Sequence, residues 1–98
     1  MVYSPKEAVI TTQSIIEGEK ITHAYCDCDK EHGDFFWEFL PDKDWNYGDL
    51  RLVAMEEIIL KDSRLLNVIN NLIENQAAIF DSNQDKWIIV PYDYSSSR

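Results

Sequence analysis

The hydrophobic residues of this chain occur in short blocks, and those of the first half have the composition of β-strands. Val9–Thr12 is rich in β-branched residues, Ile15-Ile16 follow it, and Ile21–Tyr25 contains further strand formers. The segment Glu17–Lys20 between them is polar and contains Gly18, which is typical of a turn. The simplest interpretation is two strands joined near Gly18, as a hairpin or a short meander.

The next hydrophobic block, Phe35–Leu40, is mostly aromatic and contains a single charged residue, Glu38. This composition predicts a strand that is buried on both faces or lies at the centre of a sheet. A polar loop over Asp29–Gly33 is expected before it, and Pro41 ends it because proline has no N–H to donate to a β ladder. By composition, Asp42–Asp49 is a loop.

From Leu50 onward the apolar residues recur at intervals of three and four, which predicts helices instead of strands. A short helix is expected over Leu52–Ile59, and the apolar stripe of a second helix lies within Leu65–Ile73. Either Asp62 or Ser63 is a suitable N-cap for this second helix.

The chain then returns to strand composition, after the second helix has ended within Asn70–Gln76. Ala77–Phe80 and Lys86–Val90 flank a turn at Asp81–Asp85, which predicts a closing hairpin that Pro91 ends. This order of strands, helices and strands predicts an α+β fold, with a mostly antiparallel sheet and two short helices packed on one face.

The length of 98 residues and the apolar content of 45% are sufficient for a single domain with one core. An ordered core of about 8–92 is expected, and 93–98 is expected to be a flexible tail because it contains three consecutive serines. The chain has no apolar run long enough to span a membrane, and its first residues have no signal-peptide core. Its two cysteines are too few for a disulfide framework, so we expect a cytoplasmic protein.

The charge of the chain restricts its partners, because 18 acidic residues face only 9 lysines and arginines, for a net charge of −9. Such a charge opposes binding to nucleic acids and anionic membranes and favours a basic partner. Asp27–Asp49 contains eight of the acids and two of the lysines, interleaved with six aromatic residues. This segment is too apolar for a disordered acidic tail, so we expect a folded, strongly negative surface.

Several residues resemble the pattern of a small bacterial family. They are the run Ile16–Ile21, the tyrosine at position 25, and the spaced set Asp34, Trp37 and Phe39. That family was first described as a domain of unknown function and was later assigned to polymorphic-toxin systems as immunity family thirty-three. The resemblance covers roughly residues 9–90 and implies a cytosolic immunity protein that neutralises a toxin. It continues through a short apolar helix and through Asp62, Ala77, Ala78, Phe80 and Trp87.

Residue types that bind zinc occur close together, but their spacing is poor. Cys26 and Cys28 have one residue between them, whereas structural zinc sites prefer two to four. His23 would point to the opposite face of a strand, and His32 is the only other histidine. We therefore expect two reduced thiols, with no metal and no cofactor.

Two further kinds of site are also not expected. Asp27, Asp29 and Glu31 alternate as in a calcium loop, but lysine and cysteine residues intrude and Gly33 comes one position late. Catalysis would need a nucleophile or acid with a positioned base, and no motif marks such a pair. The chain is therefore expected to have no catalytic residues and not to be an enzyme.

The predicted function is binding of a basic protein, such as a toxin domain, whose action is blocked by occlusion. Carboxylates would steer the partner, and aromatic residues among them, Trp45 above all, would be at least partly exposed to hold it. The alternative is an accessory domain that binds a basic peptide or self-associates. The residues expected to contact the partner are Asp27, Asp29, Glu31, Asp34, Asp42, Asp44, Trp45, Tyr47 and Asp49.

Overall fold

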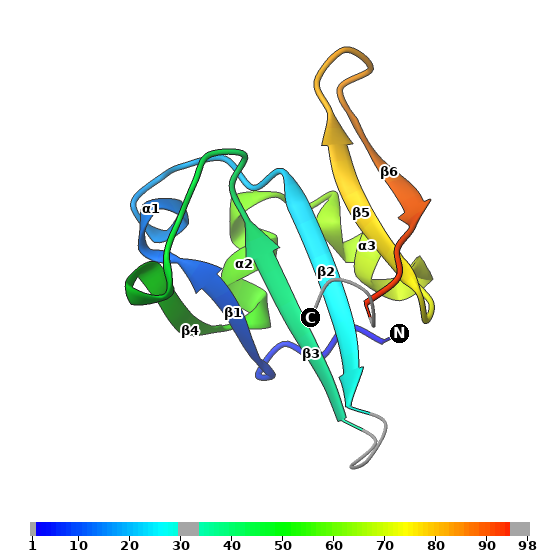
Figure 1. The fold of residues 1–98 in the computed structure, drawn as a ribbon, viewed down its shortest axis with the longest axis horizontal. Helices are drawn as coiled ribbons and strands as arrows, with labels where there is room; N and C mark the ends of the chain where they lie inside the picture. Colours follow the sequence, from blue (N-terminus) through cyan, green and yellow to red (C-terminus); the bar gives the residue numbers. More distant parts are fainter. Residues whose placement is uncertain (1, 30–33, 95–98) are drawn as a thin grey trace.

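The computed structural model describes residues 2–29 and 34–94, which form a six-stranded sheet with α2 and α3 behind it (Figure 1). The strand order is β4-β1-β3-β2-β5-β6, and all neighbours are antiparallel except β1 and β3. This confirms the predicted α+β fold with a mostly antiparallel sheet. The elements are β1 (Ala8–Thr12), α1 (Gln13–Ile16), β2 (His23–Asp29), β3 (Asp34–Leu40), the 3-10 turn η1 (Tyr47–Asp49), β4 (Leu50–Ala54), α2 (Met55–Lys61), α3 (Leu65–Asn71), β5 (Gln76–Asp81) and β6 (Lys86–Pro91).

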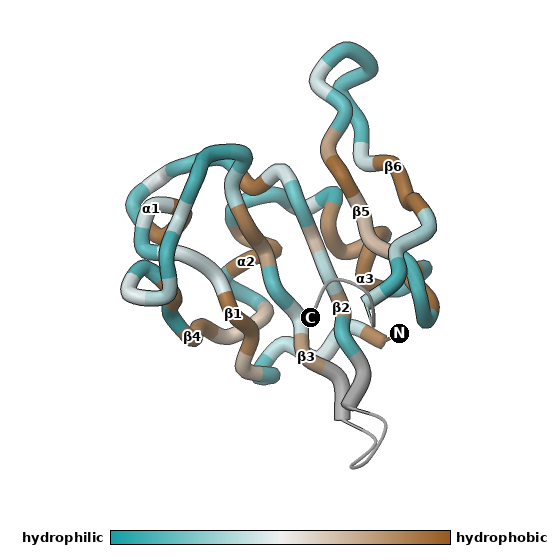
Figure 2. The backbone as a smooth tube through the Cα atoms, viewed as in Figure 1, coloured by the Kyte–Doolittle hydropathy of each residue, from teal (hydrophilic) through white to brown (hydrophobic). Residues whose placement is uncertain are grey.

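The core lies between the sheet and the two longer helices. Ala24 of β2 and Trp37 and Phe39 of β3 are at most 2% exposed and belong to one cluster with the buried residues of α2 and α3. The rings of Trp37 and Phe39 stack with their centroids 5.6 Å apart. Figure 2 shows the same division along the backbone, with hydrophobic residues in the strands and helices and hydrophilic residues in the loops.

The strand predicted at Phe35–Leu40 is confirmed as β3, and it lies at the centre of the sheet between β1 and β2. Strand side chains alternate between faces, so Phe36 points away from the helices and is 48% exposed. The side of β3 opposite the helices is therefore open at this position.

The hairpin predicted around Gly18 is wrong, because β3 lies between β1 and β2. Ile15 and Ile16 belong to the short helix α1, and Thr12 caps it by accepting a hydrogen bond from the Ile15 N–H at 3.3 Å. The predicted turn exists, with Gly18 at φ +119° and its N–H donating to the Ile15 carbonyl oxygen. Ile15 is fully buried, so the core stabilises this local turn in place of an extended strand.

The helix predicted from Leu52 begins only at Met55, and the residues before it form the edge strand β4. This strand pairs with β1, with Leu52 opposite Ile10. Val53 packs against the core, whereas Leu52 points to the other face and is 72% exposed. Pairing with a distant strand overrides the helical spacing here, since β1 provides backbone partners that no local pattern reveals.

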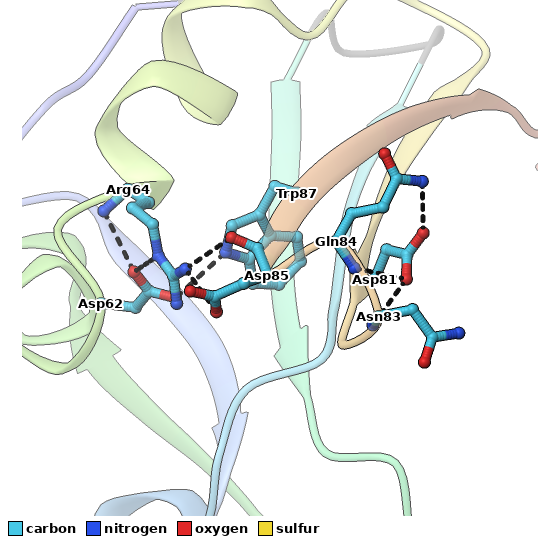
Figure 3. A network of polar contacts seen from close by, with 7 residues as sticks. All are labelled: Asp62, Arg64, Asp81, Asn83, Gln84, Asp85 and Trp87. Atoms are coloured by element: carbon cyan, nitrogen blue, oxygen red, sulfur yellow. Dashed lines mark hydrogen bonds and ion pairs between the residues drawn. The ribbon is translucent and has the colours of Figure 1, made fainter.

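The second predicted helix is confirmed as α3, but no side chain caps its N-terminus. Asp62 instead makes a small network with Arg64 and Trp87 (Figure 3). Its carboxylate accepts hydrogen bonds from the backbone N–H of Arg64 at 3.1 Å, from Arg64 Nε at 3.0 Å and from the indole N–H of Trp87 at 3.0 Å. Arg64 also contacts Asp85 at 3.2 Å, so the network joins the turn before α3 to the tip of the last hairpin.

The closing hairpin is confirmed as β5 and β6. Phe80 and Trp87 face each other across it, with ring centroids 5.7 Å apart in an edge-to-face arrangement. Phe80 is buried, and Trp87 is half-buried and packed against the core. Trp87 is therefore at the margin of the core, whereas Trp37 is at its centre.

Tyr94, which lies within the predicted flexible tail, is only 7% exposed. The Tyr94 hydroxyl accepts a hydrogen bond from the Cys26 N–H at 2.8 Å and donates one to the Gln76 carbonyl oxygen at 2.6 Å. Pairing between β2 and β5 ends one residue before this point, so the hydroxyl replaces the next rung of the ladder. Burial raises the pKa of Tyr94 to about 12. The predicted disorder of the serines at 95–97 lies outside the described residues.

Replacing Trp37 by alanine is expected to lower the free energy of unfolding by about 3–5 kcal/mol, because it removes a ring from the centre of the core. Urea denaturation followed by circular dichroism measures this loss. Phe36→Ala is the matched control, since the neighbouring ring is 48% exposed and its loss is expected to cost at most about 1.5 kcal/mol. Equal losses in the two variants would contradict the inward orientation of Trp37.

The lowered pKa of Asp62 predicts that the contribution of this residue to the free energy of unfolding depends on pH. Burial alone would raise the pKa of this carboxyl, but hydrogen bonds from Arg64 and Trp87 outweigh burial and leave the pKa lowered. Such a carboxyl adds stability above its unfolded pKa of about 4, and this stability is lost as the pH falls through the folded pKa. Asp62→Asn is therefore expected to cost about 1–2 kcal/mol at neutral pH and progressively less below about pH 4.

Urea denaturation of the parent and Asp62→Asn proteins at about pH 7 and about pH 3 tests this prediction. Asp85→Asn serves as the control, because the Asp85 side chain is 83% exposed and its ion pair is expected to contribute less than about 1 kcal/mol. If Asp62→Asn lowers the free energy of unfolding by the same amount at both pH values, the charge of Asp62 does not stabilise the fold.

Candidate functional site: a cleft on the open face of the sheet

The face of the sheet opposite α2 and α3, called the open face below, contains a cleft of about 270 Å³. His23 and Tyr25 of β2 line this cleft together with Leu40, the last residue of β3. The loop of residues 41–45 that follows β3 completes its lining. The fold therefore places part of the predicted acidic segment beside β2, from which it is separated in the sequence by a whole strand.

Hydrogen bonds within the loop give it a defined shape. Asn46 Oδ1 accepts from the Gly48 N–H at 2.9 Å, and the Asp49 carboxylate accepts from the Asn46 N–H at 3.0 Å, a reciprocal capping box that encloses η1. The guanidinium of Arg51 donates to the Gly48 carbonyl oxygen at 2.7 Å. Asp49, predicted to contact a partner, is half-buried and stabilises the loop by accepting the hydrogen bond from the Asn46 N–H.

Two aromatic side chains of the loop face solvent. Trp45 is 36% exposed and Tyr47 is 86% exposed, and their rings meet edge to face with centroids 6.3 Å apart. The prediction that Trp45 is at least partly exposed is confirmed. Trp45 also lines the cleft, so it can contact a bound molecule there.

Asp42 and Asp44 provide the negative charge of the cleft. Both are exposed and both line it, on either side of Lys43 in the sequence. The ammonium of Lys43 forms an ion pair with Glu19 at 3.2 Å. Within residues 2–29 and 34–94, no ion pair joins a base to Asp42 or Asp44, so their charges are unbalanced locally.

A row of aromatic rings extends from the cleft across the open face. His23 and Tyr25 stack with centroids 6.1 Å apart, Tyr92 contacts Tyr25 at 5.1 Å, and Tyr94 contacts Tyr92 at 4.7 Å. This row was not predicted from the sequence, because His23 was considered as a metal ligand and Tyr94 falls within the predicted tail. The alternation of His23 and Tyr25 along a predicted strand was the available signal.

The environment of the row is partly desolvated. Burial, followed by the neighbouring Tyr92 and Glu38, raises the pKa of Tyr25. His23 Nδ1 and the Thr22 hydroxyl are hydrogen-bonded at 2.8 Å. His23, Tyr25 and Tyr92 are partly exposed, so a ligand can contact their rings, whereas Tyr94 is buried.

Three of the other predicted acids, Asp27, Asp29 and Asp34, belong to the half of the β2–β3 hairpin that is farther from the cleft loop (Figure 1). Asp27 is half-buried, on the same face as Tyr25, and Asp29 and Asp34 pair through their backbones. The side chains of Asp29 and Asp34, and all of Glu31, lie outside the described part of the structure. Asp27 is two residues from the cleft-lining Tyr25, about 7 Å along β2. The length of β3 instead separates Asp34, and Asp29 paired with it, from the cleft by about 20 Å.

Cys26 and His23 point to opposite faces of β2, as strand alternation predicted. Cys26 is a free thiol in the core with 3% exposure, whereas His23 lines the cleft. Among the described residues, no three side chains of the types that bind metals come together. Asp29, predicted to be the first residue of a loop, is instead the last residue of β2. The rest of that predicted loop, residues 30–33, lies outside the described residues.

No helix in the part of the chain that the structure describes is long and apolar enough to cross a membrane. Comparisons with protein-family models, with curated proteins and with solved structures give no significant match to this chain. The resemblance to immunity family thirty-three therefore stays a prediction, and the argument for a function depends on the cleft itself.

Trp45→Ala is expected to leave the fold intact and to cost at most about 1.5 kcal/mol of stability, because the ring lies outside the core cluster. Urea denaturation of the Trp45→Ala and Trp37→Ala proteins compares their losses in the free energy of unfolding. A loss as large as that of Trp37→Ala would make Trp45 a core residue and would remove it from the candidate site.

Proposed function

We propose that this protein is a non-catalytic binding module that holds a basic protein at the cleft on its open sheet face. One observation carries the proposal: the unbalanced carboxylates of Asp42 and Asp44 lie beside the solvent-facing rings of Trp45 and Tyr47. Acidic and aromatic groups on one preshaped loop suit the lysine and arginine side chains of a partner.

The two kinds of group have different roles in binding. The net charge of −9 and the carboxylates at the cleft attract a basic partner and raise its association rate, an effect that salt weakens. The rings then bury the aliphatic part of a lysine or arginine and accept its charge in a cation–π contact of about 0.5–2 kcal/mol. The capping box of the loop lowers the entropy that is lost on binding.

The resemblance to the immunity family supports a specific biological role. In this role the chain is a cytoplasmic immunity protein that covers the working surface of a basic toxin, and occlusion replaces any chemical step. The alternative is an accessory domain that self-associates through the open face. Three exposed apolar side chains favour that alternative: Phe36 at 48%, Leu52 at 72% and Ile79 at 39% exposure.

Affinity capture from the producing organism, with identification of the captured proteins, gives the partner for a kinetic test. Reversing the charges of Asp42 and Asp44 to lysine is expected to slow association about tenfold at low salt and to reduce its salt dependence. Trp45→Ala is expected to act mainly through faster dissociation. Reversal of Glu17 and Glu74, which are exposed and outside the cleft, matches the change in net charge.

Equal kinetics in the cleft variant and in the Glu17 and Glu74 control would show that only the net charge matters, and the proposed site would be discarded. Analytical ultracentrifugation of the isolated protein addresses the alternative. A stable dimer that Leu52→Lys dissociates would favour self-association over capture of a basic partner.

A further inference from the structure

A second cavity, of about 360 Å³, adjoins the cleft through the Lys43–Glu19 ion pair and has a different electrostatic character. It lies between two turns of the chain, residues 18–21 before β2 and the turn that joins α2 to α3. Its charged lining consists of Lys20, Lys61 and Arg64, together with Glu19 and Asp62. Three of the nine lysines and arginines of an acidic chain therefore meet at one cavity.

The two acids of this cavity are already neutralised. Glu19 forms its ion pair with Lys43 at 3.2 Å, and Asp62 forms one with Arg64 at 3.0 Å. Asp62 also accepts the hydrogen bond from Trp87 (Figure 3), so its oxygens are occupied by donors of the protein. Neither acid needs a further cation from solvent.

The two lysines have no such partner. In the described residues, no carboxylate lies within ion-pair distance of Lys20 or Lys61. The Lys20 ammonium lies 3.6 Å from the centre of the Phe80 ring, and the Lys61 ammonium donates to the Ile16 carbonyl oxygen at 3.2 Å. Each ammonium has three N–H donors, and the described protein groups engage at most one of them, so the others can bind a ligand.

We infer that this cavity binds a dianionic phosphate group, with Lys20 and Lys61 as its ligands. Two unpaired ammonium groups match the charge of a dianion, and lysine binds phosphate oxygens as a compact point charge. Salt screens the charges of the chain that lie farther away than the Debye length, which is about 8 Å in physiological salt. The inference does not depend on the proposed capture of a basic protein.

The structure also favours a preformed site. A Cβ atom placed on Gly18 would meet no atom within 4 Å, so the cavity is open at this residue of its lining. Arg64 lies over the same Phe80 ring, 4.8 Å from its centre, and its bonds to Asp62 and Asp85 fix the opposite wall. An oxyanion can therefore enter without displacing an internal ion pair.

The test is a titration of the isotopically labelled protein with inorganic phosphate at about pH 8, at constant ionic strength maintained with sodium chloride. Saturable amide shifts are expected at residues 18–21, with acetate binding at least about fivefold more weakly because it carries one charge. Lys20→Met and Lys61→Met are each expected to raise the apparent Kd by about threefold to fivefold, and the double variant is expected to show no saturation.

Lys6→Met is the matched control, because it makes the same change in net charge at an exposed lysine that pairs with Glu56 outside the cavity. Its Kd for phosphate is expected to equal that of the parent protein. Glycerol phosphate distinguishes the sources of the group: equal affinity assigns the site to a phosphomonoester, and weaker binding assigns it to free phosphate.

The absence of saturable shifts, equal affinity for acetate, or unchanged phosphate binding in the double lysine variant would each overturn the inference. Near-UV circular dichroism confirms that the variants are folded. None of these results changes the expectation for the cleft, whose Asp42 and Asp44 variants leave this cavity intact.

Discussion

Burial of one face of β3 is the constraint on which the rest of the structure depends. Trp37 and Phe39 enter the core between the sheet and helices α2 and α3, and β1 and β2 flank the strand on its two edges. Because side chains alternate along a strand, this burial directs Phe36 and Glu38 to the opposite, open face. It also places the end of β3, and the loop after Pro41, beside β2, where the cleft forms.

A single ion pair influences the charge of both candidate sites. Lys43 lies between Asp42 and Asp44 in the sequence, but its ammonium contacts Glu19. The carboxylates at the cleft are left unbalanced, and an acid at the second cavity is neutralised. An exposed pair of this kind contributes at most about 1 kcal/mol to stability, so its importance lies in the distribution of charge. The chain thereby has an acidic site and a basic site although its overall charge is strongly negative.

Near the end of the described chain, a side chain extends the link between two strands beyond their backbone pairing. The Tyr94 hydroxyl links β2 to β5 beyond their last backbone pair, and Tyr92 packs on Tyr25 beside the cleft. Similarly, Asp62 and Arg64 attach the tip of the last hairpin to the turn before α3. These side-chain links stabilise the β5–β6 hairpin, which otherwise contacts the rest of the sheet through one short ladder.

The sequence by itself determined the fold class, the strand at Phe35–Leu40, the second helix, the closing hairpin and the exposure of Trp45, because periodicity, proline and turn residues act over short distances. Only the tertiary structure decided that Leu50–Ala54 is a strand, that Ile15 turns into the core and that Tyr94 is buried. Each of these depends on a partner far away in the chain. For the same reason the acids of Asp27–Asp49 divide between two ends of a hairpin, and His23 and Tyr25 join the cleft.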